Sequence, residues 1–301
     1  MIGISIRQLE VFVAVASAGS VRAAAARLSV TQPAVSMALS ELERQIGAPL
    51  FDRIRGRLHL STRGKELLPS AQEVVERMHE MLREPDEHTQ ALTGELRLGA
   101  SNTIGNYLVG ELLGAFVRRH PSVSLSVSVE NTRTTVAGVL EHRIDVGCVE
   151  GPVNHPEIDT LPWRNDDLQV CAALDHPLAH RQRLRPVDFA EADWILREPG
   201  SAMRTQSETL MASLPPGRIL LELGQVEAIK QAVIAGLGIA CLPSAATADA
   251  VAAGRLAVLD TPFLALQRRL SLVLHKARYR GALIDAFVHS LEPTLTTRSD
   301  A

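Results

Sequence analysis

The sequence lacks the features that would place the protein in a membrane or outside the cell. Among its 301 residues, 46% of them hydrophobic and 22% charged, no apolar run approaches the roughly 20 residues that a transmembrane helix needs. The opening stretch MIGISIRQLEVF carries Arg7 and Glu10 among its apolar residues and does not have the layout of a signal peptide. We therefore expect a cytoplasmic protein that has no membrane partner.

Cysteine is scarce as well. The three cysteines, Cys148, Cys171 and Cys241, lie far apart, each within an apolar string. An odd number at this spacing fits neither a disulfide framework nor a zinc site. We expect buried free thiols; a redox-sensing pair would require that the fold bring two of them together.

The common motifs of enzymatic chemistry are also missing. The chain has no G-x-S-x-G turn, no phosphate-binding Gly-rich loop and no H-E-x-x-H, and its ten histidines show no metal-ligand spacing. We therefore expect no catalytic residue, no metal site and no cofactor. These absences oppose an enzyme, and the missing signal peptide opposes the second alternative, a solute-binding protein.

Charge is distributed unevenly along the chain. Residues 1–65 hold nine Lys or Arg against four acids, a net of +5, whereas residues 66–91 hold seven acids against two Arg, a net of −5. A basic N-terminal part on an otherwise acidic chain suggests a polyanionic partner for that part alone.

Residues 1–60 have the pattern of a helix-turn-helix. A first helix with apolar residues at the 3.6-residue period ends at Gly19. Ser20 caps an alanine-rich second helix, and Thr31 caps a third helix with Pro33 in its first turn. Gly47 closes that third helix. Two short helices joined by a tight turn, the second with small polar residues at its start, form the helix-turn-helix layout.

The segment PLFDRIRGRLHLST, which follows, predicts a hairpin wing around a basic turn. Its arginines can reach phosphates or the minor groove, and the start of the third helix should face the major groove. The residues that we expect to contact DNA are Ser20, Arg22, Thr31, Gln32, Pro33, Ser36, Met37, Arg53, Arg55 and Arg57. The alternative is a three-helix bundle that serves structure or protein contact.

The run SVRAAAARLSVTQPAVSMALSELERQIGAPLFDRIRGRLHLSTRGKELL resembles the DNA-binding segment of the LysR-type transcriptional regulators. The motifs Ala-Ala-x-x-Leu, Thr-Gln-Pro-Ala-Val-Ser, Leu-Phe-x-Arg and Thr-x-x-Gly occur in that order at the family's spacing. Met37 departs from the pattern, because many members have a basic or polar residue there; a thymine methyl group is a contact it can make. The resemblance implies a regulator that binds double-stranded operator DNA, with RNA polymerase as a partner if it activates.

A long helix is predicted over residues 61–92, as a linker. Its apolar residues follow a heptad-like seam, with three further apolar residues alongside: Leu67, Ala71, Val74, Met78 and Met81, then Leu68, Val75 and Leu82. Such a stripe needs a partner, either the chain itself or a second copy. The resemblance implies a homodimer that assembles into a homotetramer, and Pro85 should kink or end the helix.

Residues 93–301 alternate between strand-like and helical segments, which indicates parallel sheets with crossover helices. The stretches GELRLGAS, IDVGCVEGP and VIAGLGIACLP resemble the two-lobed, periplasmic-binding-protein-like α/β effector domain of the LysR type. Lobe I should comprise about residues 93–163 and 267–301, and lobe II about residues 164–266. The fold class is therefore α+β multidomain: an all-α winged helix-turn-helix head, a long linker helix and this effector domain.

Ligands of open α/β sheets bind beyond the carboxyl ends of the strands. Polar residues follow several predicted strands, and helix N-termini there suit an anion. The residues that we expect to contact a small-molecule effector are Ser101, Asn102, Thr103, Asn131, Thr132, Glu150, Ser201, Met203 and Arg204. Ordinary helix capping is the alternative role for each. The stretch ASNTIGNYL is similar to a branch with regulators of sulfur assimilation and carbon fixation, which implies a small anion or organic acid.

Overall fold

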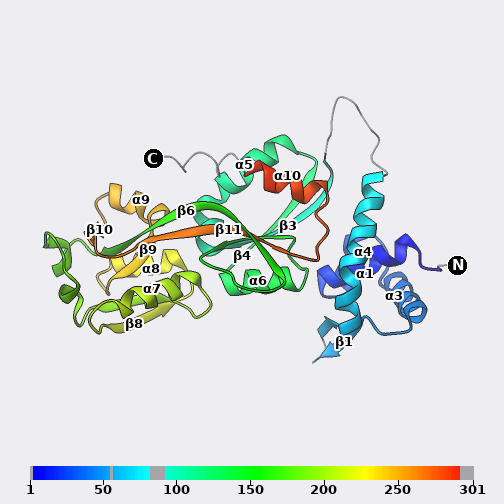
Figure 1. Ribbon diagram of the computed structural model, residues 1–301, viewed down its shortest axis with the longest axis horizontal. Helices are drawn as coiled ribbons and strands as arrows, with labels where there is room; N and C mark the ends of the chain where they lie inside the picture. Colours follow the sequence, from blue (N-terminus) through cyan, green and yellow to red (C-terminus); the bar gives the residue numbers. More distant parts are fainter. Residues whose placement is uncertain (1–2, 55–56, 82–91, 292–301) are drawn as a thin grey trace.

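The computed structural model describes residues 3–54, 57–81 and 92–291 (Figure 1). The N-terminal head lies at one end of an elongated arrangement, next to the first of two α/β lobes. Within the described part, no single helix is long and apolar enough to cross a membrane; α1 and α2 of the head meet that test only together, as a pair bent by 118°.

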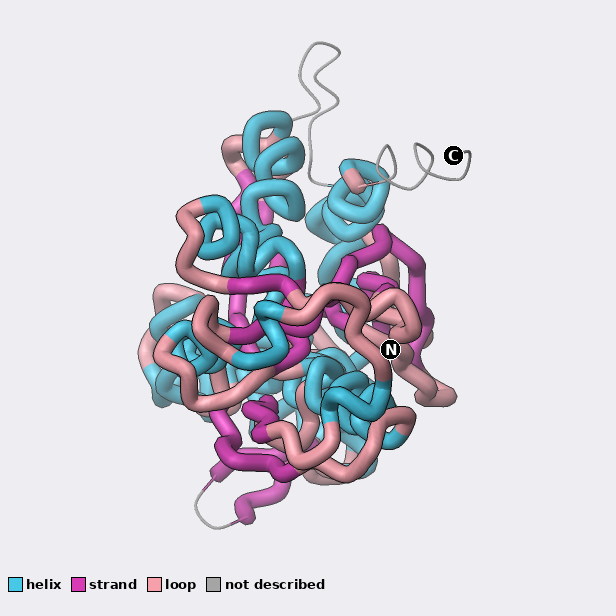
Figure 2. The backbone as a smooth tube through the Cα atoms, turned by 90° about the vertical axis from the view of Figure 1, so that its left-hand side faces the viewer, coloured by secondary structure: helices cyan, strands magenta, loops and turns pink. Residues whose placement is uncertain are grey.

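Three helices and a hairpin form the head. They are α1 (Ile6–Ala18), α2 (Val21–Arg27), α3 (Gln32–Ile46), β1 (Phe51–Ile54) and β2 (Arg57–Leu60). The hydroxyls of Ser20 and Thr31 accept backbone N–H groups in the first turns of α2 and α3. Gly19 and Gly47 take left-handed conformations at the ends of α1 and α3, which only glycine adopts without steric cost. The predicted caps are therefore confirmed. Figure 2 shows the hairpin projecting away from the other elements.

The linker helix α4 (Thr62–Met81) divides its apolar residues between two faces. Leu68 and Ala71 are buried in the head's core with residues of α1, and Val75 is buried one turn further along. Val74 and Met81 lie on a different face and are 40% and 78% exposed. The stripe thus packs partly on its own chain, and the remainder is exposed. Leu82 and Pro85 lie outside the described residues.

The first lobe is a parallel sheet covered on both faces. Its elements are β3 (Gly94–Ser101), a π-helical turn (Ile104–Leu108), α5 (Val109–Arg119), β4 (Val123–Glu130), α6 (Thr132–Leu140), β5 (Val146–Glu150) and α10 (Ala282–Ser290). Strand β3 pairs in parallel with both β4 and β5. Helices α5 and α10 lie on one face and α6 on the other (Figure 1).

The second lobe repeats the strand–helix alternation. It contains 3-10 turns (Pro177–His180 and Pro186–Phe189), β7 (Asp193–Arg197), α7 (Ala202–Ala212), β8 (Arg218–Leu223), α8 (Val226–Ile234), β9 (Ala240–Pro243), α9 (Ser244–Ala252) and β10 (Ala257–Val258). Strands β7 and β8 are parallel, and a parallel bridge joins Trp194 to Ile239. Parallel pairing within each lobe was predicted from the strand–helix succession and is confirmed.

Two long antiparallel strands join the lobes. They are β6 (Ile158–Ala172) and β11 (Gln267–His275), and they complete a sheet in the order β10-β6-β11-β5-β3-β4, with β9 also paired to β6. The first half of β6 is less apolar than its second half, and its burial alternates where it bridges the lobes.

The three cysteines are buried free thiols, as predicted. Cys171 and Cys241 lie on the adjacent strands β6 and β9, but Cys241 is in register with Val170. Successive side chains alternate between the faces of a sheet, so the two sulfur atoms point to opposite faces. Burial raises the pKa of Cys171 and of Cys241 to about 12, which leaves the thiols protonated and unreactive.

Leu68 tests whether the linker helix is part of the head's core. It is fully buried there, so Leu68→Ala should lower the free energy of opening of α1 by about 2–5 kcal/mol, measured by native-state hydrogen exchange. Met37→Ala removes an apolar side chain that is 73% exposed, and should change that value by less than about 0.5 kcal/mol. Equal hydrogen-exchange protection of the α1 amides in the two variants would contradict the assignment of α4 to the head's core.

Candidate functional site

The start of α3 presents an exposed polar surface on a buried apolar base. Val35 and Leu39 anchor the helix in the head's core, so the opposite face points outward. Thr31, Gln32, Pro33, Ser36 and Met37 are all exposed. The side chains of Gln32 and Ser36 make no hydrogen bond to any described residue, so their polar groups are available to base edges.

The predicted basic residues of the head differ in what they contact. Arg22 and Arg53 are exposed and pair with no carboxylate among the described residues, whereas Arg7, Arg44 and Arg63 each pair with a nearby glutamate. Unpaired guanidinium groups are the ones free to neutralise phosphates. The hydroxyl of Ser20 is used as a helix cap. Arg55 lies outside the described residues, and of Arg57 only the backbone, in β2, is described.

Glu150, at the end of β5, is the centre of a polar cluster between the lobes. Its carboxylate is 2% exposed and accepts hydrogen bonds from Ser101 Oγ at 2.9 Å and from the Thr103 backbone N–H at 2.9 Å. Burial alone would raise the pKa of Glu150, but the charge of Arg268 and these hydrogen bonds outweigh it and hold the pKa below its ordinary value. Glu150 is therefore an anion that the protein itself keeps charged.

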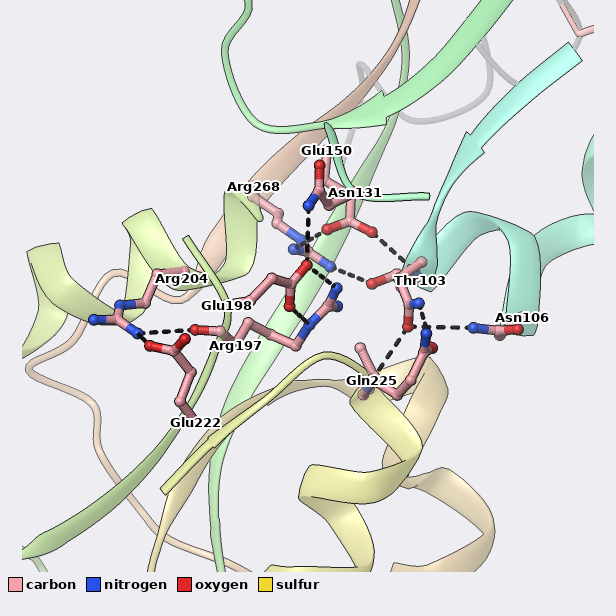
Figure 3. Close-up of polar contacts among 12 residues, drawn as sticks. Thr103, Asn106, Asn131, Glu150, Arg197, Glu198, Arg204, Glu222, Gln225 and Arg268 are labelled. Atoms are coloured by element: carbon pink, nitrogen blue, oxygen red, sulfur yellow. Dashed lines mark hydrogen bonds and ion pairs between the residues drawn. The ribbon is translucent and has the colours of Figure 1, made fainter. Parts of the chain in front are cut away.

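Arg268, on β11, is the residue that sequence reasoning missed. Its guanidinium is 2% exposed and lies 2.8 Å from Glu150 and 2.7 Å from Asp166, and it donates to Thr103 Oγ1 at 3.0 Å (Figure 3). The period of two in β11 places Arg268 on the same side as the buried Leu270. A charge at a core-facing strand position was the available signal.

Asparagine side chains span the two lobes. Asn102 Nδ2 donates to Gln225 Oε1 at 2.6 Å, and Asn131 Nδ2 donates to Glu198 Oε1 at 3.1 Å. Thr132 Oγ1 donates to the Glu150 carbonyl oxygen at 3.4 Å. The structure thus brings the predicted polar residues after β3, β4 and β5 into one network at the lobe junction (Figure 3).

Two of the predicted effector residues lie elsewhere. Met203 is 1% exposed and is packed in the core of the second lobe. Arg204 donates to Glu222 at 2.7 Å and to Glu208 at 2.6 Å, and Figure 3 shows it turned away from Arg268. Met203 is therefore a core residue and Arg204 the centre of an ion-pair cluster on α7, so the cation of the junction is Arg268 instead.

A cavity of about 1350 Å³ opens beside this network, between α6, α7 and the crossing strands. Arg133, Arg268 and Arg269 line it, and none of the described residues that line it is acidic. The first turns of α6 and α7 border it through Thr132 and Ser201, and the Ser201 hydroxyl makes no capping bond. Cations, helix N-termini and hydroxyls without a carboxylate make this wall attractive to an anion.

Part of the cavity lining is apolar. Val136 and Leu140 of α6, Val153, Pro162 and Phe263 belong to it. A ligand with an anionic group and a hydrocarbon part therefore matches this mixed lining. Among the described residues no group of three or more His, Cys, Asp or Glu could hold a metal ion.

Comparison with known proteins covers nearly the whole chain. Residues 6–65 match the family model described as "Bacterial regulatory helix-turn-helix protein, lysR family", and residues 89–296 match "LysR substrate binding domain". The chain is 37% identical over 296 residues to an uncharacterized HTH-type transcriptional regulator of Escherichia coli, YeiE, covering 98% of this chain and 99% of YeiE.

Solved structures share the fold. A full-length OxyR variant from Pseudomonas aeruginosa superposes with a TM-score of 0.76 at 22% identity, over 96% of this chain and 94% of that one. The regulatory domain of CcmR from Synechocystis, in complex with 2-PG, has a TM-score of 0.63 at 27% identity, over 69% of this chain and all of that one.

Removal of Arg268 tests how the lobe junction is held together. Arg268→Met leaves Glu150 and Asp166 buried without their counter-charge, which should cost about 3–5 kcal/mol of unfolding free energy. Arg269→Met, at the neighbouring exposed position, should change it by less than about 0.5 kcal/mol. Urea unfolding followed through Trp163 and Trp194, both in the lobes, measures the difference; equal midpoints would show that the cluster does not support the fold.

Proposed function

The chain belongs to the LysR-type transcriptional regulators, and on that premise we propose that it reads operator DNA with its head and responds to an anionic effector between its lobes. It is a DNA-binding regulator with an effector-binding domain. Members of this family are typically not enzymes, and our proposal assigns the chain no catalytic step. The observation that carries the anionic effector is the cavity whose lining includes Arg133 and Arg269, which pair with no described carboxylate, and, among the described residues, no acid.

In the proposed DNA complex, α3 enters the major groove with its N-terminal end toward the bases. The Gln32 amide can donate to and accept from one adenine edge, and the exposed Met37 side chain can cover a thymine methyl group. Arg22 and Arg53 contact phosphates on either side, which sets affinity without reading sequence. A cytoplasmic location, where chromosomal DNA is accessible, is part of this proposal.

In the proposed effector complex, the anionic group lies against Arg133 and the N-terminus of α7. The network already bridges the lobes through Asn102–Gln225 and Asn131–Glu198, so a ligand there changes the free energy of lobe closure. It shifts the balance of conformations only by its differential affinity for them. The CcmR regulatory domain, at 27% identity, was solved with 2-PG, which supports an organic anion here.

We extend the proposal to assembly. Val74, Met78 and Met81 form an apolar face of α4 that no described element of the same chain covers completely. Pairing of two such faces would give a homodimer whose two heads read two half-sites of an operator. A homotetramer of two dimers, and contact with RNA polymerase if the protein activates, complete the proposed set of partners.

Substitutions at Gln32 and Arg53 separate base reading from phosphate contact. Gln32→Ala should reduce the preference for operator over random duplex by about 1–3 kcal/mol. Arg53→Ala should weaken both duplexes equally and reduce the slope of log K against log salt by about 1. Fluorescence anisotropy with DNA from the gene's own upstream region, over a salt series, measures both; a Gln32→Ala variant that weakens both duplexes equally would refute the base contact.

Substitution of Arg133 tests the anionic effector. With 2-PG and sulfate as probes in calorimetric titrations, Arg133→Ala should weaken binding about tenfold or more, because one charge-assisted hydrogen bond is lost. Arg204→Ala is the matched control, since Arg204 is held by Glu222 and should leave binding unchanged. Equal binding by the two variants would place the anion elsewhere, and binding by neither probe would refute the anionic class while leaving the DNA function intact.

A further inference from the structure

Helix α4 has a third face that neither the head's core nor the open apolar face uses. Glu76 and Glu80, one helical turn apart, lie on this face and meet the first lobe of the same chain. Because the face differs from the one that carries Val74 and Met81, α4 can contact the lobe and a second copy at once. The contact is therefore compatible with the proposed dimer.

Glu76 joins a row of alternating charges in the first lobe. It pairs with Arg278, whose guanidinium also lies 3.1 Å from Asp145. Asp145 in turn accepts from Arg97 Nε at 3.1 Å. The side chains of Arg278 and Asp145 are 8% and 4% exposed, so these charges interact with little screening by water.

Glu80 caps a helix that cannot cap itself. Helix α10 begins after Gly281, which has no side chain to accept the free N–H groups of the first turn. Glu80 Oε1 accepts from the Ala282 N–H at 3.1 Å, and Glu80 Oε2 accepts from the Tyr279 hydroxyl at 3.1 Å. A carboxylate at a helix N-terminus is also favoured by the helix dipole. The guanidinium of Arg77 lies 4.7 Å from the centre of the Tyr279 ring.

Gly281 shows that the lobe is shaped for this contact. A Cβ atom there would lie 3.1 Å from carboxylate oxygens of both Glu76 and Glu80, and 3.3 Å from the Tyr279 ring. Its φ of −69° suits any residue, so glycine is not required by the backbone. The close approach of α4 is what favours glycine at this position.

From these contacts we propose that Glu76, Glu80, Asp145, Arg278 and Tyr279 form a latch that clamps α4 to the first lobe, so that head and first lobe move as one body. An exposed ion pair between Arg27 and Glu95, at 2.8 Å, adds a second, weaker tie. A cavity of about 450 Å³ remains beside the latch, so the contact is polar and partly open, which suits release. The latch deepens the proposed function and rests on it in one respect. If an effector moves the lobes, the latch transmits that movement to the head.

Distance measurements between spin labels test the latch. Labels at Ser40→Cys in the head and Ser122→Cys in the first lobe report their separation, because the native cysteines are buried and unreactive. Full-length labelled protein, diluted with unlabelled protein, should give one narrow distance distribution. Gly281→Leu should broaden it, whereas Gly110→Leu, on the surface of α5 where a Cβ meets nothing within 4 Å, should not.

A second pair of variants covers the case in which Gly281→Leu misfolds. Glu80→Gln keeps the side-chain shape and removes the charge that caps α10 and accepts from the Tyr279 hydroxyl, and it should also broaden the distribution. Glu66→Gln, on the same helix but paired only with Arg63, should leave it narrow. A narrow distribution in both latch variants would overturn the proposal. The measurement uses neither DNA nor effector, so that result would leave the regulatory function untouched.

The latch should also loosen as pH rises. Burial, opposed in part by Arg278 and reinforced by Asp145 and Glu80, raises the pKa of Glu76 from 4.5 to about 7. The docked state therefore binds a proton that the undocked state releases: its advantage is full below pH 4.5 and is lost as pH rises through 7. Burial also lowers the pKa of His142, which interacts with Asp145, to about 3, and it lowers the pKa of His275, whose ring lies 4.3 Å from that of His142.

The same spin labels measure this dependence. The narrow fraction of the distance distribution should fall between pH 6 and pH 8 in the native chain, and fall less in Glu76→Gln. His79 on the same helix lies 3.6 Å from Glu10 and is retained in that variant, so the difference between the two profiles belongs to Glu76. A narrow fraction that rises with pH would contradict the buried docking of Glu76.

Discussion

The structure depends most on one buried arginine at the point where the two lobes meet. Arg268 lies on a crossing strand, holds Glu150 at the end of β5 and Asp166 on the other crossing strand, and reaches Thr103 before the π-helical turn and α5. Removing three charges from water is costly unless each finds partners of good geometry. Here Glu150 also accepts from Ser101 and Thr103, so the cluster is satisfied and fixes the ends of the lobe I strands.

That cluster also explains the electrostatics of the neighbouring cavity. Arg268 pairs with both acids of the cluster. Glu198 pairs with Arg197 and accepts a hydrogen bond from Asn131. Among the described residues, the polar lining of the cavity is left with arginines, hydroxyls and glutamine amides and with no carboxylate. The Glu150 carboxylate accepts from the Thr103 N–H after β3, and its charge disfavours a second anion at that helix start. The start of α6 is capped by Asn131, whereas α7 has no side-chain cap, so an anion is directed to the start of α7.

The linker helix α4 has three faces with different surroundings. Its buried face holds it to α1, its acidic face meets Arg278 and the start of α10, and its remaining apolar face is open. Residues three or four apart share a face of a helix, so three such stripes fit on twenty residues without competing. A change in the first lobe can thus reach the head through rigid contacts, while the same helix remains available for pairing of two copies.

What the sequence alone determined was local. The helix caps at Ser20 and Thr31, the glycines that end α1 and α3 and the alternation of strands and helices follow from interactions within a few residues. They predicted the head and the parallel sheets, whereas the two-lobed fold was implied by the resemblance to the LysR-type effector domain. The ends of β3, β4 and β5 indicated where polar groups would gather.

Tertiary structure alone decided which of these groups meet. Arg268 and Glu150 are 118 residues apart, and Glu80 and Ala282 are 202 apart, so no periodicity relates them. Arg204 has the positive charge expected of an anion-binding residue and lies at the start of α7. It nevertheless pairs with Glu222 on the next strand and points away from the junction. The sequence predicted one apolar stripe along α4. In the structure these residues lie on two faces, one buried in the head and one exposed. Contacts of this kind depend on how the chain closes on itself, because burial and pairing are set by the partner and not by the residue.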